Sequence, residues 1–167
     1  MIQNYWAKMT QYKYDLFYLE SYLEKSVKTS RVIKILLAVF SSGSIAAWAT
    51  WQNLAFIWGF VIAASQVFSA ISSYFPYQKR IKEISNMKLE LSHLYYQVEK
   101  DWNDIANGVI NVTEVNDICY KYKEQWETIS DRYFVEDVLP HNEKCKAYAE
   151  NEKDKYFKTN FGGQNNA

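Results

Sequence analysis

The chain has 167 residues, with 19 lysines and arginines balanced by 19 aspartates and glutamates, so its formal net charge is zero. This length suits one domain or a small membrane unit with polar extensions. The balanced charge excludes a global field that would attract nucleic acid or acidic partners.

Residues Tyr5 to Ser30 predict a helix with a coiled-coil seam. Apolar side chains recur at spacings of four and three, as in a heptad pattern. The seam residues are Tyr5, Met9, Tyr12, Leu16, Leu19 and Leu23. Further aromatic side chains occupy the other faces, so the helix must be covered, either by later helices of this chain or by copies of itself. No Gly or Pro separates it from the next segment, which allows one continuous helix.

The stretch from Ile35 to Gln78 contains no charged residue and no histidine. It is about twice as long as the roughly 20 apolar residues that cross a bilayer. A polar turn at 50–53 divides it, which predicts a transmembrane hairpin with spans at about 33–49 and 54–75. A buried hairpin in a soluble helical protein is the alternative, but buried helices usually carry shorter apolar runs.

Basic residues flank this stretch on both sides, with Lys28 and Arg31 before it and Lys79 and Arg80 after it. The positive-inside rule then places both termini in the cytoplasm. Cys119 and Cys145 would lie in a reducing compartment, so no disulfide is expected.

The pattern after Pro76 predicts further helices and no strands. One helix spans Tyr77 to Ala106 and ends at Asn107-Gly108, and the next begins after an N-cap at Thr113 and stops before Pro140. A charged helix follows at 142–157. The predicted parts are an N-terminal aromatic helix (1–32), the hairpin (33–76), a cytoplasmic helical region (77–158) and a disordered tail (159–167). The predicted fold is thus an all-α membrane protein, a hairpin with helical flanks that form a bundle, assembled as a homo-oligomer.

The residues give little sign of catalysis. The histidines are His93 and His141, and neither lies near a nucleophile motif or a Gly-rich loop. His141 and Cys145 stand four residues apart, but a metal site needs further ligands at matching spacing. We therefore expect no enzyme, no cofactor and no metal, and interpret His141 as part of an exposed helix start.

Small polar residues share one face of the second predicted span and continue on the first. They are Ser65, Gln66, Ser69, Ser72 and Ser73, together with Ser41 and Ser44. Such residues either let helices pack closely or line a water-filled pore. One hairpin can neither enclose a pore nor bury this face, so both interpretations require several copies. Pro76 would act as a hinge.

The order of parts resembles the SLATT superfamily of two-transmembrane effectors in bacterial antiphage defence. An aromatic and basic helix (Tyr18, Tyr22, Lys28, Arg31) precedes the hairpin, and Tyr77-Gln78-Lys79-Arg80 opens the long helix after it. The resemblance implies a pore-forming effector located in the bacterial inner membrane, which it depolarises or permeabilises. It also implies a nucleotidyltransferase partner, or a nucleotide or oligonucleotide signal that acts on the cytoplasmic bundle. No functional residue is carried over by position. The alternative is a non-conducting oligomeric membrane scaffold that recruits a soluble partner.

Overall fold

The structure is a computed structural model. It describes the backbone of residues 1–50, 77–134 and 139–162, together with 56, 59–60, 62–64 and 66–67. Side chains are described for the same residues except 37, 39–50 and 77–78. The statements below refer to these residues.

Four long helices account for most of the described chain. They are α1 (Ile2–Thr50), α3 (Tyr77–Ala106), α4 (Val112–Tyr133) and α5 (Glu143–Phe161). The chain divides into two compact units. Unit 1 comprises Met1–Glu24 and Lys82–Ala167, and unit 2 comprises Lys25–Ile81.

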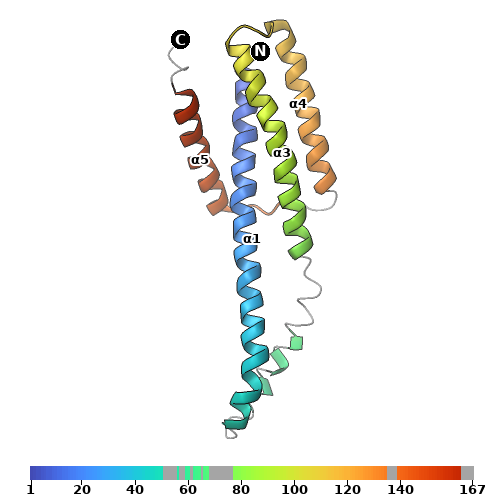
Figure 1. Ribbon diagram of the computed structural model, residues 1–167, viewed down its shortest axis with the longest axis vertical. Coiled ribbons are helices and arrows are strands. Elements are labelled where there is room, and N and C mark those ends of the chain that lie inside the picture. Colours follow the sequence, from blue (N-terminus) through green and yellow to red (C-terminus); the bar gives the residue numbers. More distant parts are fainter. Residues whose placement is uncertain are drawn as a thin grey trace. The chain divides into compact units, whose positions relative to one another are not determined.

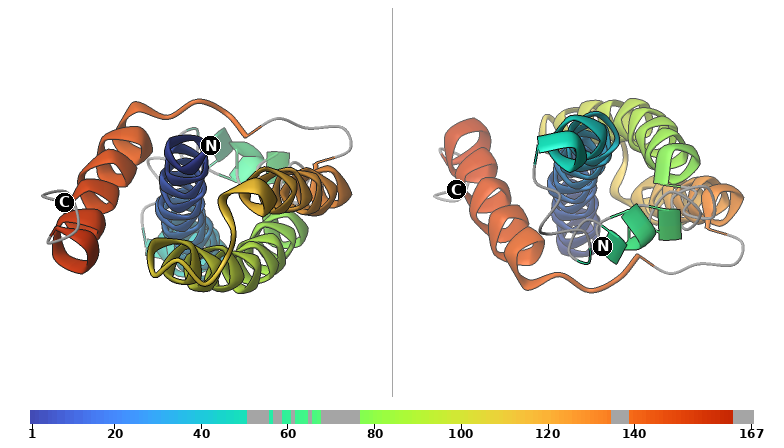
Figure 2. Two further views of the ribbon diagram at one scale, coloured as in Figure 1. Left: turned by 90° about the horizontal axis from the view of Figure 1, so that it is seen from above. Right: turned by 90° about the horizontal axis from the view of Figure 1, so that it is seen from below.

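Unit 1 is a helical bundle in which successive helices run in alternating directions. The first part of α1 lies between α5 on one side and the pair α3 and α4 on the other (Figures 1 and 2). The connection between α3 and α4 is short, as antiparallel neighbours allow. Apolar side chains of α1 therefore pack against α3, α4 and α5.

The predicted seam of α1 lies inside this bundle. Tyr5, Met9, Tyr12, Leu16 and Leu19 are buried, and Leu23 packs against the same core as a partly buried residue. Their neighbours in the core come from α3, α4 and α5. They are Ile84, Met87, Leu91, Leu94, Tyr95, Val98, Trp102 and Ile105, then Val115, Cys119, Tyr122 and Trp126, and lastly Phe161. The seam is therefore covered by later helices of its own chain.

The turn between α3 and α4 depends on one glycine and one cap. Gly108 has φ +71°, in the left-handed region that suits glycine, and α3 ends two residues before it. Asn111 is the N-cap of α4, and its side chain accepts a hydrogen bond from the Thr113 backbone N–H at 3.3 Å. The predicted N-cap at Thr113 was therefore wrong by two residues. Asn111 fits the role better, because its extended backbone lets the side-chain oxygen reach the next turn.

The later helix boundaries also differ from the prediction. α4 ends at Tyr133, well before Pro140, and α5 reaches Phe161 instead of stopping at 157. The N-cap of α5 is Asn142, whose side chain accepts from the Cys145 N–H at 3.2 Å. Residues 159–161, predicted as part of a disordered tail, belong to this helix. Residues 163–167 lie outside the described residues.

The membrane-spanning hairpin is contradicted. Within the described residues, none of the helices joins enough length to enough apolar character for a bilayer crossing. A span needs about 20 predominantly apolar residues. The part of α1 that runs up to and into the predicted first span carries Lys25, Lys28, Arg31 and Lys34. The all-α prediction agrees with the described helices, whereas the fold class of a membrane protein was wrong.

The same finding overturns what depended on that hairpin. It contradicts the transmembrane helices, the ion channel or pore, and the location in a bacterial inner membrane with cytoplasmic termini. Of the predicted pore-lining residues, Gln66 is described, as an exposed helical residue. The side chains of Ser41, Ser44, Ser65, Ser69, Ser72 and Ser73, and the predicted hinge Pro76, lie outside the described residues.

Candidate functional site

A cavity of about 330 Å³ lies in unit 1, where α1, α3 and α4 meet the segment that follows α4. Most of its wall is apolar. Its lining residues are Asp15, Tyr18, Leu19, Met87, Leu91, Trp126, Ser130, Phe134 and Leu139. We call it the Asp15 pocket. An apolar cavity of this size with a few polar groups is typical of a ligand site.

Asp15 is the only acidic or basic residue in this lining. Its carboxylate is partly buried, and Gln11 Nε2 donates a hydrogen bond of 2.9 Å to Oδ1. Burial raises the pKa of Asp15 to about 6, because the charged form loses hydration. The Gln11 hydrogen bond and the positive charge of Lys8 act in the opposite direction without cancelling this effect. The carboxylate therefore lacks a partner that would fully stabilise its charge.

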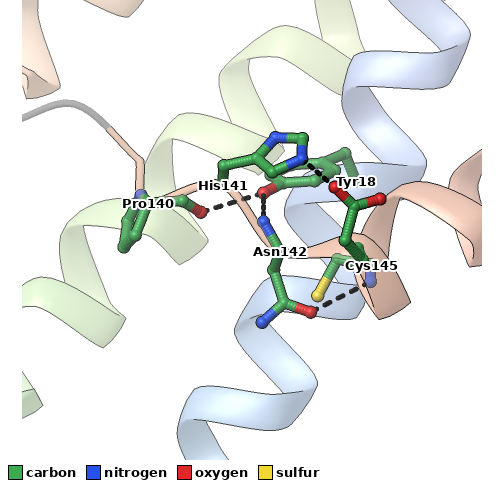
Figure 3. A network of polar contacts seen from close by, with 6 residues as sticks. Tyr18, Pro140, His141, Asn142 and Cys145 are labelled. Atoms are coloured by element: carbon green, nitrogen blue, oxygen red, sulfur yellow. Dashed lines mark hydrogen bonds and ion pairs between the residues drawn. The ribbon is translucent and has the colours of Figure 1, made fainter.

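The two hydroxyl groups of the lining are already engaged. Tyr18 donates a hydrogen bond of 3.0 Å to the carbonyl of Pro140 and accepts one of 3.1 Å from the backbone N–H of Asn142 (Figure 3). Ser130 Oγ donates to the Trp126 carbonyl at 2.9 Å, within α4. With both lining hydroxyls engaged, Asp15 is the charged group of the lining that remains available to a ligand.

Tyr18 also fixes one rim of the pocket. Its hydroxyl holds the backbone on both sides of His141 against α1, at the point where α5 begins (Figure 3). Leu139 precedes this anchor and lines the pocket. The position of Leu139 therefore depends on a hydrogen bond that joins residues far apart in the sequence.

A stacked aromatic pair supports another part of the wall. Trp126 lies against Tyr12, with ring centroids 4.2 Å apart and planes inclined by 15°. Tyr12 is buried, and burial raises its pKa to about 12. The indole of Trp126 is therefore held in place by α1 while it faces the pocket.

Unit 2 contains a hollow of different character. Its lining carries two cations, Arg31 and Lys34, beside Ser30, Val27 and Ile81. The cations would favour an anionic ligand, the opposite of the Asp15 pocket. This hollow lies in the basic stretch that the sequence placed before the hairpin.

His141 and Cys145 do not form a site together. His141 is exposed, and its Nε2 lies 2.5 Å from Glu143 Oε1, whose pKa this contact lowers. Cys145 is buried, and Cys119 and Cys145 are free cysteines. In the part of the chain that the structure describes, no cluster of three His, Cys, Asp or Glu side chains could hold a metal.

Sequence reasoning missed Asp15. The available signal was its position between the seam residues Tyr12 and Leu16, where a solvated acid is unusual, together with Gln11 four residues earlier. The rest of the pocket comes from α3, α4 and Leu139, which the pattern of α1 cannot show.

No protein-family model, curated protein or solved structure matches this chain. The fold and the site define it as a helical protein whose bundle contains a largely apolar pocket with one carboxylate. The resemblance to the SLATT superfamily, the role in antiphage defence and the nucleotide-related partners remain predictions.

Proposed function

We propose that the protein is a binding module that recruits a partner by taking a cationic, largely apolar side chain or small amine into the Asp15 pocket. This keeps the recruitment role expected of a scaffold and assigns it to the helical bundle of unit 1. The observation that carries the proposal is the Asp15 carboxylate, partly buried in an apolar wall with Gln11 as its only hydrogen-bond donor among the described residues.

The charge of Asp15 selects the head group of the ligand. An ion pair with a new cation stabilises a partly buried carboxylate with a raised pKa more than it stabilises a solvated carboxylate. The reason is the low dielectric of the surrounding wall. Lys8 acts on it only as a distant positive charge. A bound ammonium or guanidinium would supply the ion pair that the pocket lacks.

The rest of the wall selects the body of the ligand. Leu19, Met87, Leu91 and Leu139 present aliphatic surface, and Trp126 adds an aromatic face. A volume near 330 Å³ accommodates one large side chain or a small amphiphilic amine. Lysine and arginine side chains have this character, with an apolar stem and a charged end.

The location of the acid also supports a binding role. Burial of the Asp15 charge costs folding free energy at neutral pH, and among the described residues the through-space attraction of Lys8 and the Gln11 hydrogen bond offset only part of this cost. Residues that disfavour folding are often located at sites of binding or catalysis. The binding interpretation explains why the pocket contains an acid where an amide would be less costly.

The test uses the full chain and two probes of equal size, hexylamine and 1-hexanol. Binding is followed by the NMR signal of the Trp126 indole N–H, assigned with the variant Trp126→Phe. We expect hexylamine to bind at least about tenfold more tightly than 1-hexanol, the effect of a charge-assisted hydrogen bond. We expect Asp15→Asn to remove this preference.

A matched control separates the pocket from general charge. Asp117→Asn removes one carboxylate from the exposed surface of α4 and should leave the preference unchanged. Equal binding of the amine and the alcohol by the unmodified protein would overturn the proposal. Loss of the preference in Asp117→Asn would show that attraction is not localised at Asp15.

A further inference from the structure

Lys13 lies among three aromatic rings where α1 meets α3 and α5. Its Nζ is 3.7 Å from the ring centroid of Tyr156, 4.5 Å from that of Tyr95 and 5.4 Å from that of Phe17. We call these three rings and the Nζ between them the ammonium cage. All three distances lie within the range of cation–π attraction.

The cage holds the positive charge without hydrogen-bond acceptors. Among the described residues, Lys13 forms no hydrogen bond or ion pair, although its ammonium has three N–H donors. The negative charges of Glu99 and Glu20 stabilise the charged form of Lys13 through space. Glu99 Oε1 accepts a hydrogen bond of 2.5 Å from the Tyr156 hydroxyl. An ordinary ammonium is therefore an imperfect fit, because the rings attract its charge but leave its N–H groups unmatched.

A methylated ammonium suits this environment better. Methylation keeps the positive charge, removes N–H donors and adds apolar surface, and aromatic cages recognise such cations. The unequal distances leave room on one side. An N–C bond of about 1.5 Å directed at Phe17 would bring the methyl carbon to about 4 Å from that ring, which is van der Waals contact.

We propose that Lys13 is an N-methylation site whose mono- or dimethylated ammonium is held in the ammonium cage. The methyl group comes from a sulfonium donor carried by a separate methyltransferase. The neutral amine attacks the methyl carbon, the N–C bond forms as the S–C bond breaks, a thioether leaves, and the amine proton passes to solvent. A second cycle gives the dimethylated form.

Two properties of Lys13 permit this reaction. The side chain is only partly buried, so part of it remains exposed to solvent. Burial lowers the pKa of Lys13, which increases the fraction of neutral amine, and the charges of Glu99 and Glu20 only partly oppose this effect.

The first test is peptide mapping of the protein isolated from the cell that makes it. Trypsin does not cleave after dimethyllysine, so a modified chain yields the peptide 9–25 with the added methyl mass. An unmodified chain yields the peptide 9–13 instead. Recovery of Lys13 entirely in the unmodified short peptide would overturn the proposal.

The second test examines whether the cage accepts the methyl groups. The folded full chain is methylated with ¹³C-formaldehyde and a borane reductant, with Lys13→Arg as the matched control. We expect one dimethyl signal, absent from Lys13→Arg, to be shifted upfield by the rings relative to exposed lysines such as Lys121. We also expect a higher unfolding midpoint for methylated wild type than for methylated Lys13→Arg. A Lys13 signal that coincides with those of exposed lysines would contradict the proposal.

Discussion

Tyr12 of α1 stacks on Trp126 of α4, with ring centroids 4.2 Å apart, yet the Tyr12 hydroxyl is buried without a hydrogen-bond partner among the described residues. The same side chain thus stabilises the helix contact through its ring and opposes folding through its hydroxyl. A buried polar group without a partner costs about 1–3 kcal/mol.

We therefore expect Tyr12→Phe to raise the free energy of unfolding by about 1 kcal/mol, because it removes the unpaired hydroxyl and keeps the ring. Urea unfolding of the full chain measures this. Tyr12→Ala is the comparison and should lose about 3–5 kcal/mol, since it also removes the ring. A less stable Tyr12→Phe would mean that the hydroxyl has a partner after all.

Asp15→Asn should stabilise the protein at pH 7. The folded pKa of Asp15, about 6, is raised above its ordinary value of 3.8, so the folded state binds its proton more tightly than the unfolded state. The wild type therefore keeps its full free energy of unfolding below pH 4. It loses at most about 3 kcal/mol of this free energy as the pH rises to about 6. Asp15→Asn does not have this loss.

The measurement is the difference in unfolding free energy between Asp15→Asn and wild type across pH 4 to 7. It should be small at pH 4 and grow up to about pH 6. Asp117→Asn, at an exposed position of α4, should stay within about 0.5 kcal/mol of wild type. A difference that does not depend on pH would refute the assigned role of burial.

Tyr156→Phe should weaken the attachment of α5. The Tyr156 hydroxyl donates to Glu99 Oε1 at 2.5 Å, and this bond together with burial raises the pKa of Tyr156. Its loss should cost about 1.5 kcal/mol, since the acceptor is charged and partly buried. Urea unfolding tests this, with Tyr120→Phe as the control because Tyr120 is exposed. Equal midpoints for Tyr156→Phe and wild type would contradict the expectation.

Gly108→Ala should destabilise the turn between α3 and α4 by about 1 kcal/mol. Gly108 has φ +71°, and a Cβ there would meet no atom within 4 Å, so the cost comes from the backbone conformation alone. Gly108→Asn should cost less, because Asn tolerates this region. The helical Gly59 also has open space around it, and Gly59→Ala should be neutral or slightly stabilising. Thermal unfolding of all three variants provides the comparison.

The periodic parts of the sequence predicted the helices and, for residues 5–30, the face that is buried. The helix at Tyr77–Ala106 was predicted with its observed ends, because Gly108 marks the turn after it. The boundary at Thr113 was wrong because Asn111 and Thr113, two residues apart, can both act as caps, and the extended backbone at Asn111 selects between them. Periodicity resolves helix interiors better than helix ends.

The hairpin was wrongly predicted and the pocket was missed, for different reasons. The hairpin was inferred from composition, which does not show whether a segment forms a helix long enough to span a bilayer. The pocket was missed because Asp15 acquires its surroundings from Met87, Trp126 and Leu139, which are distant in the sequence. Such long-range contacts leave no periodic signal in α1.

The burial of the α1 seam by distant helices has a consequence for synthesis of the chain. The Tyr5 hydroxyl donates a hydrogen bond to the carbonyl of Val98, 93 residues later. The Tyr18 hydroxyl donates one to the carbonyl of Pro140, 122 residues later. At the speed of translation, roughly 5 to 20 s pass between the synthesis of Tyr5 and that of its partner Val98. Until then the emerging aromatic face has no native cover, so nascent chains of this protein should depend on a chaperone that shields it.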